Sequence, residues 1–171
     1  RFSLARAFAV FRVRLLWLRI NDDQFRANPP NPAWQTHQAG IARLMQLYSA
    51  DRPEIHDVVA EMRAVVDTYA DRVLIGEVYL PVERVVAYYG HDMKGAHLPF
   101  NFQLIFAVWK AGAVARIVAE YEDAMPKGGS PNWVLVNHDQ TRIATRMVVA
   151  ERRRVTIGHI TLLPTAPRPH G

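Results

Sequence analysis

The 171-residue sequence contains no cysteine. Disulfides, thiolate-bound metal ions and cysteine nucleophiles are therefore excluded. The absence also fits a reducing compartment, so we expect a cytoplasmic protein, although this absence alone leaves the compartment open. Half of the residues are hydrophobic and 22% are charged, a composition typical of one packed domain with a sizeable core.

Acidic residues are missing from the first 21 positions, which hold five arginines. These arginines account for the whole formal net charge of +5, so the rest of the chain is neutral. Nucleic-acid-binding proteins usually spread their charge over one face, and we expect no nucleic-acid partner. Arginines also interrupt the apolar N-terminal run, so no membrane span is expected. An organellar transit peptide is the alternative to a buried strand or helix in this segment.

Several motifs of cofactor and nucleophile chemistry are absent. The pair Gly128-Gly129 fits neither a phosphate-binding loop nor a dinucleotide fingerprint, and no Gly-x-Ser-x-Gly elbow occurs. Apart from His138, the histidines show no spacing typical of metal ligands. We therefore expect no metal and no cofactor.

Alternating strand-like and helix-like patterns run through the chain. Residues 53–69 carry apolar side chains at helical spacing, and helices are also expected over 81–89, 107–125 and 141–154. Strands are expected over 11–15, 73–75, 99–106 and 133–136, with a last apolar run at 155–163. The adjacent prolines of 28–32 predict an extended loop. This order indicates a parallel α/β architecture.

Two acids directly follow predicted strands, at the positions where parallel α/β folds place their chemistry. Glu77 follows 73–75, and Asp139 follows 133–136 beside Asn137 and His138. A single acid at a strand end is more often a helix cap or a surface charge. Two such acids favour an active site, and paired carboxylates are what glycoside hydrolysis requires.

Three segments carry a family resemblance: IGEVY at 75–79, HLPFNF at 97–102 and PNWVLVNHDQ at 131–140. With DDQFR at 22–26, NPPNP at 28–32 and YSADRPE at 48–54, the chain resembles glycoside hydrolase family 13, the α-amylase superfamily. Within it, the chain is most similar to the α-glucosidase and oligo-1,6-glucosidase branch. The resemblance covers about residues 11–155.

The resemblance implies roles for individual residues. Glu77 matches the general acid/base, and Asp139 matches the aspartate that stabilises the transition state. Arg12 matches the arginine that orients the nucleophile. The implied substrate is an α-glucoside or a malto- or isomalto-oligosaccharide. Contacts with it are implied for Arg12, Phe102, Asn137, His138 and Arg142.

One position departs from the family pattern. The family has its nucleophilic aspartate two residues after Arg12, where this sequence has Arg14. Positions i and i+2 of a strand share a face, so Arg12 and Arg14 are both expected to point into the mouth of the barrel. A guanidinium there is not competent as a nucleophile.

The length is too short for a complete (β/α)₈ barrel, which typically needs about 250 residues. The resemblance therefore implies part of a TIM barrel, from about strand 4 to strand 7 or 8, over residues 11–163, with a non-matching segment 1–10 and a tail 164–171. Open strand edges would favour self-association. Two functions remain: a retaining α-glucosidase-type hydrolase, or a non-catalytic, sugar-binding remnant of one.

Overall fold

The computed structural model of the chain describes residues 9–38 and 40–136. Its three strands form one parallel sheet in the order β1-β2-β3. The strands are β1 (Val10–Val13), β2 (Val73–Gly76) and β3 (Leu98–Pro99). Phe11 pairs with Leu74, and Ile75 pairs with Leu98. Parallel strands that are adjacent both in sequence and in space confirm the predicted α/β class.

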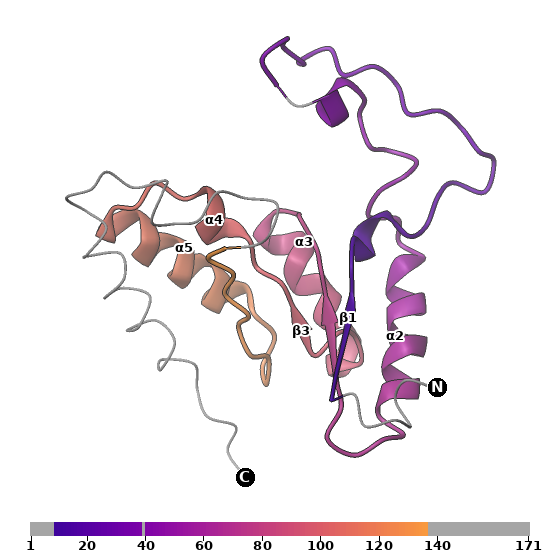
Figure 1. Cartoon of the computed structure of the whole chain (residues 1–171), viewed down its shortest axis with the longest axis vertical. Coiled ribbons are helices and arrows are strands. Elements are labelled where there is room, and N and C mark those ends of the chain that lie inside the picture. The colour runs from indigo at the N-terminus through magenta and orange to yellow at the C-terminus, as the bar shows by residue number, and fades with distance from the viewer. Residues whose placement is uncertain (1–8, 39, 137–171) are drawn as a thin grey trace.

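Helices connect the strands and follow the last one (Figure 1). The α-helices in the described part are α2 (Ile55–Val66), α3 (Val82–Val86), α4 (Gln103–Phe106) and α5 (Ala111–Ala124). Short 3-10 helices occupy Leu16–Leu18, Gly40–Arg43, Ala87–Tyr89 and His91–Met93. No helix in these residues is both long enough and apolar enough to cross a membrane.

Helix α2 forms where the sequence has its clearest apolar stripe. Ile55, Val59 and Val66 are buried on one side of the helix, at spacings of four and seven residues. They join a core cluster that also includes residues of β2, α3 and α5. The buried members of this cluster are Leu16, Ile55, Val59, Val66, Leu74, Val78, Val82, Val85, Tyr88, Tyr89, Ala96 and Tyr121.

The helix predicted over 81–89 is present as α3 followed by the 3-10 helix Ala87–Tyr89. Gly90 ends it with a φ of 75°, in the left-handed region that favours glycine. A Cβ atom at Gly90 would lie 2.4 Å from the backbone nitrogen of Gly95. Both the backbone angle and the close approach therefore require glycine here.

The strand predicted over 11–15 is shorter than expected. β1 begins at Val10 and ends at Val13, and Leu15 adopts a left-handed conformation with φ 49° and ψ 44°. This turn directs the chain into the 3-10 helix Leu16–Leu18, where Leu16 enters the core. Beyond the end of β2, the pairing with β1 continues through the backbone N–H of Glu77, which donates to the carbonyl of Val13.

The strand predicted over 99–106 is wrong for most of its length. β3 stops at Pro99, and α4 begins at Gln103, whose N–H donates to the Asn101 side chain at 2.9 Å. An Asn side chain that accepts this bond favours a turn into a helix. The helix predicted from 107 starts later, at Ala111, because Ala107 and Lys110 have extended backbones.

The strand predicted over 133–136 is reduced to a single parallel pair between Asn101 and Trp133. Two backbone hydrogen bonds frame this pair, from Asn101 to Asn132 and from Val134 to Asn101, each 3.0 Å long. The segment therefore continues the order of the sheet beside β3. The elements predicted at 141–154 and 155–163 lie outside the described residues.

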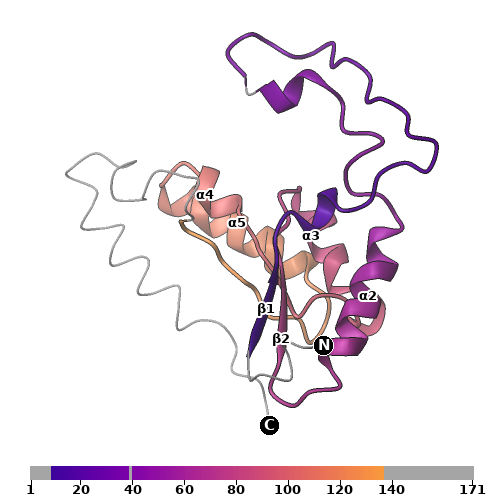
Figure 2. The ribbon, with the colours of Figure 1, turned by 45° about the vertical axis from the view of Figure 1, so that its right-hand side comes forward.

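Residues 19–54 form a long excursion between β1 and α2. It extends away from the sheet and its helices in both views (Figures 1 and 2). It contains the 3-10 helix Gly40–Arg43 and an antiparallel bridge between Pro30 and Leu44. No helix forms at 28–32, which confirms the extended loop that the prolines predict.

Candidate active site

Glu77 lies directly after β2, at the carboxyl end of the strand, and is only 1% exposed. Its N–H donates to the carbonyl of Val13, and its carbonyl accepts from Leu16, both at 2.9 Å. These two bonds tie Glu77 to the chain that leaves β1. The backbone of this acid is therefore held by the sheet and not by a loose loop.

Arg12 provides the closest charged partner of Glu77. Its Nη2 donates to Oε2 of Glu77 at 2.6 Å. The same guanidinium lies over the ring of Phe100, 5.0 Å from its centroid. A buried carboxylate needs a partner of opposite charge, and Arg12 supplies it from the neighbouring strand.

Arg14 approaches the same carboxylate oxygen. Its Nε lies 4.0 Å from Oε2 of Glu77, and its side chain is 56% exposed. Arg12 and Arg14, two residues apart on one extended segment, thus converge on Glu77, as expected for side chains on one face. Arg14 is thus a cation next to the buried acid, and its match to the nucleophile position of the family stays a prediction.

Phe102 belongs to an aromatic group beside these charges. It is 4% exposed, and its ring stacks on Tyr79 with centroids 3.9 Å apart. Phe100 meets Phe102 edge-on at 5.5 Å. Phe102 therefore packs within the site, and its contact with a substrate stays a prediction. The sequence did not predict Tyr79 and Phe100 as site residues, although both lie in segments that carry the resemblance.

Four other predicted site residues come from the segment that follows Val136. Asn137, His138, Asp139 and Arg142 lie outside the described residues. The structure does bring the segment that precedes them beside β3, through the pair of Asn101 with Trp133. The roles of these residues stay predictions. Within the described part, no group of three or more His, Asp or Glu side chains could hold a metal ion.

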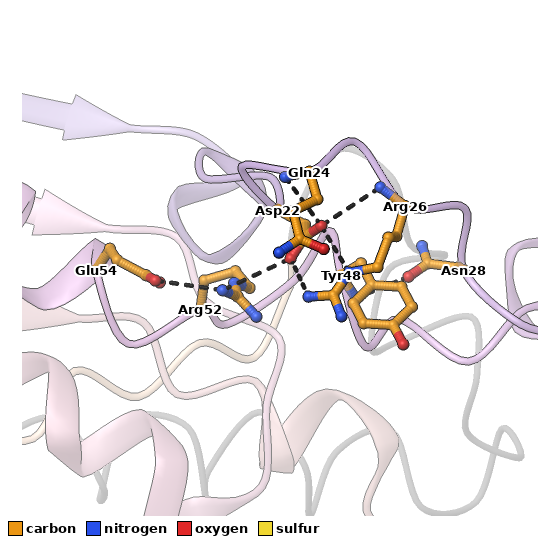
Figure 3. A network of polar contacts seen from close by, with 7 residues as sticks. All are labelled: Asp22, Gln24, Arg26, Asn28, Tyr48, Arg52 and Glu54. Atoms are coloured by element: carbon orange, nitrogen blue, oxygen red, sulfur yellow. Dashed lines mark hydrogen bonds and ion pairs between the residues drawn. The ribbon is translucent and has the colours of Figure 1, made fainter.

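A second buried acid, Asp22, has a large set of polar partners (Figure 3). Arg26 donates to both of its carboxylate oxygens, with Nη2 2.5 Å from Oδ1 and Nε 2.9 Å from Oδ2. Arg52 lies 3.9 Å from Oδ1 and also pairs with Glu54 at 3.2 Å. The side-chain hydrogen bond from Arg26 is the main cause that lowers the pKa of Asp22 to about 2.

The same network joins the two ends of the excursion. The N–H of Asp22 donates to the carbonyl of Tyr48 at 2.7 Å, and the N–H of Tyr48 donates to Asn28 Oδ1 at 2.8 Å. The Arg26 guanidinium lies 4.4 Å from the centroid of the Tyr48 ring. Asp22 therefore organises the base of the excursion, a role that the sequence pattern did not reveal.

Asp51 fixes the returning end of the excursion to the body of the fold. It accepts a hydrogen bond from the hydroxyl of Tyr88 at 2.8 Å and pairs with Arg84 at 2.5 Å. Its N–H donates to the carbonyl of Trp17 at 2.6 Å. Burial is the main cause that raises the pKa of Tyr88, followed by its bond to Asp51. The excursion thus starts and returns at anchored positions close to the candidate site.

Comparison with known proteins decides the family. The alpha amylase catalytic domain matches residues 17–165. The chain belongs to the α-amylase family. It is 38% identical over 144 residues to a salivary alpha-glucosidase of Anopheles gambiae, with 79% of this chain and 23% of that protein covered. It is 36% identical over 131 residues to Maltase A1 of Drosophila melanogaster, with 71% and 22% covered.

The fold agrees with this assignment. The structure of the alpha-glucosyl transfer enzyme XgtA superposes with a TM-score of 0.73 and 26% sequence identity, covering 85% of this chain and 28% of that one. The described α/β fold is therefore part of a (β/α)₈ barrel, and the chain spans less than a third of each of these relatives. The resemblance to the α-glucosidase branch is confirmed.

Proposed function

We propose that residues 11–163 form the acid/base-bearing part of a retaining α-glucosidase-type glycoside hydrolase that acts on short α-linked gluco-oligosaccharides. The observation that carries the proposal is the position of Glu77. It is a buried carboxylate at the carboxyl end of β2, and it accepts a 2.6 Å hydrogen bond from Arg12 on the adjacent strand β1. Carboxyl ends of barrel strands are where such enzymes place their catalytic groups.

In the proposed reaction, Glu77 protonates the oxygen of the leaving sugar and later removes a proton from the attacking water. Arg12 acts as a positioning residue, because its hydrogen bond fixes one oxygen of the carboxylate. Asp139 is proposed to stabilise the positive charge that develops on the sugar ring. The maltase and alpha-glucosidase relatives support this choice of substrate class.

A second candidate function is sugar binding without turnover, and the position of Arg14 favours it. A retaining reaction needs a carboxylate that attacks the anomeric carbon, and Arg14 stands where the family has it. Its Nε is 4.0 Å from Oε2 of Glu77, so the cation lies at the carboxyl ends of the strands, beside the proposed acid/base. Positive charge there also disfavours a transition state that is itself cationic.

Turnover of p-nitrophenyl α-glucoside by the wild type, Arg14→Asp and Glu77→Gln separates the two functions. We expect very weak wild-type turnover, because loss of the nucleophile in another covalent-catalysis enzyme costs about 10⁶-fold in kcat. Arg14→Asp is expected to raise turnover. Glu77→Gln should abolish what remains. Circular dichroism melts of all three proteins check that each one is folded.

Each outcome selects one function. Strong wild-type turnover that disappears in Glu77→Gln establishes the hydrolase and shows that Arg14 is not disabling. A gain in Arg14→Asp establishes the hydrolase with Arg14 as its block. Folded proteins that all lack turnover but bind maltose in calorimetry establish the sugar-binding function instead.

A further inference from the structure

Arg12 and Arg14 meet the carboxylate of Glu77 at the carboxyl ends of β1 and β2, and Arg19 contacts the backbone of Arg14. Arg12 and Arg14 both approach Oε2 of Glu77, at 2.6 Å and 4.0 Å. Arg19 comes from the 3-10 turn that follows, and its Nε and Nη2 donate to the carbonyl of Arg14 at 3.2 Å and 2.8 Å. Positive charge is therefore in excess within this group of four residues.

The cations and the acid of this group differ in accessibility. The side chain of Glu77 is 2% exposed, whereas those of Arg12 and Arg14 are 38% and 56% exposed. A ligand that approaches the carboxyl ends of β1 and β2 thus contacts the guanidinium groups before it contacts the carboxylate. A planar guanidinium binds carboxylate or phosphate through two parallel hydrogen bonds.

Aromatic rings lie directly beside these cations. The Arg12 guanidinium lies over Phe100, which contacts Phe102 edge-on, and Phe102 stacks on Tyr79. Ligand sites commonly combine such apolar and aromatic walls with a few placed polar groups. Phe102 is buried, but Tyr79 and Phe100 are partly exposed and offer apolar contact to a sugar, and the arginines suit an anionic substituent on that sugar.

We propose that this group of residues selects a carbohydrate that carries a carboxylate or phosphate group, with Arg14 as the residue that binds the anion. The inference rests on the proposed function in placing the sugar at Glu77, and it adds the charge class of the ligand. Arg19 supports the site by holding the backbone of Arg14 through the Arg14 carbonyl. The substitution that removes the expected nucleophile thereby creates a selective contact.

Calorimetric titration of the whole chain with four probes tests the ligand class. The probes are glucose 6-phosphate, glucuronate, maltose and inorganic phosphate. We expect one of the two anionic sugars to bind at least about tenfold more tightly than maltose at low salt, since hydrogen bonds between charged groups are the stronger ones. Which of the two binds identifies phosphate or carboxylate as the anion. Added salt should weaken this binding, because the guanidiniums are exposed.

Variants with opposite expected effects test the residues. Arg14→Gln should weaken binding of the anionic sugar by about tenfold or more. Glu77→Gln should strengthen it severalfold, because it removes the competing carboxylate. Arg14→Lys, which keeps the charge without the planar fork, should fall between wild type and Arg14→Gln. Arg116→Gln, at an exposed position of α5, serves as the matched control and should leave binding unchanged.

Several results would overturn the proposal. They are equal or tighter binding of maltose, binding of inorganic phosphate as tight as that of the sugar phosphate, no binding of either anionic sugar, and weaker binding in Glu77→Gln. Maltose separates this failure from that of the proposed function. A chain that binds maltose but shows no preference for the anionic sugars keeps its α-glucoside specificity and loses only the charge selectivity proposed here.

Discussion

At the scale of single residues, Asp22 shows how a buried charge is accommodated. The residue is 2% exposed, yet its carboxylate accepts hydrogen bonds from the Arg26 side chain and from the backbone N–H groups of Gln24 and Arg26. These partners replace the water that burial removes. Burial alone would raise the pKa of Asp22, and the bonds from Arg26 outweigh that effect.

The lowered pKa of Asp22 predicts acid sensitivity. Its folded value of about 2 lies below the ordinary 3.8, so the ionised group stabilises the fold above pH 4, and this contribution is lost as the pH falls toward 2. Asp22→Asn should therefore lower the Tm at pH 5. The gap in Tm between wild type and variant should narrow steadily down to pH 2.

Asp23→Asn is the matched control for this titration, because Asp23 is the exposed neighbour of Asp22. Its Tm should stay parallel to that of the wild type over the same pH range. A gap for Asp22→Asn that is independent of pH would contradict the role given to the ionised carboxylate.

Single residues also show the limits of sequence reasoning. The position of Glu77 after a strand followed from the apolar run that precedes it, and the structure places it there. The burial of Asp22 did not follow from any pattern. Its partner Arg26 is only four residues away, but Arg52 and Tyr48 reach Asp22 only when the excursion folds back. A charge that depends on a tertiary contact carries no periodic signal in the sequence.

At the scale of elements, regular spacing predicted structure better than composition did. α2 was predicted from a stripe that repeats with the helical period, and it is present over most of the predicted range. The strand predicted over 99–106 rested on aromatic and apolar content alone. Phe102, Leu104 and Ile105 are indeed buried, but Leu104 and Ile105 belong to α4. A buried helix needs the same residue types as a buried strand, so composition alone did not distinguish the two.

His97 connects β2 to the start of β3 through its side chain and its backbone. Its Nδ1 accepts the N–H of Leu74, and its own N–H donates to the carbonyl of Leu74, both at 3.0 Å. Burial is the main cause that lowers the pKa of His97. The charge of Arg63 adds to this effect, and Asp67, 3.5 Å from Nε2, opposes it. Protonation of Nδ1 would replace an acceptor by a donor facing another N–H.

The pairing of β2 with β3 should therefore weaken in acid. Because the folded pKa of His97 is lowered, its contribution is present above its ordinary value of 6.5 and is lost as the pH falls below it. We expect the Tm of the wild type to fall between pH 7 and pH 5 more steeply than that of His97→Gln. His91→Gln, with a side chain that is 94% exposed, is the control and should retain the wild-type slope. Equal slopes in all three proteins would refute this role.

At the scale of the whole molecule, β1 is an outer strand of the sheet among the residues that the structure describes. This strand pairs with β2 on one side, and Val10 and Phe11 are 52% and 39% exposed. Exposed apolar residues on an edge strand favour pairing with another chain. The parallel α/β class followed from the alternating order of the predicted elements, and the barrel was implied by the family resemblance. Open strand edges were expected from the incomplete barrel, and the folded arrangement shows that Val10 and Phe11 are exposed on one of them.

Self-association of the chain is therefore expected at micromolar concentration, with static light scattering as the measurement. Phe11→Lys should shift the distribution toward monomer, because a charge on an edge strand opposes pairing. Phe25→Lys is the control. Phe25 is 90% exposed and belongs to the excursion, outside the sheet, so its replacement should leave the distribution unchanged. Monomeric wild type, or an equal effect of both replacements, would contradict association through β1.

The excursion has a consequence for engineering. The bond from Asp22 to Tyr48 and the bond from Asp51 to Trp17 close its base, so the residues between 28 and 47 form a loop whose two ends are already side by side. Closing a loop between ends that are held together carries little further entropic cost. The tip is thus a natural site for grafting: loops from other members of the family, or unrelated binding peptides, could be exchanged there while the sheet and Glu77 keep their positions.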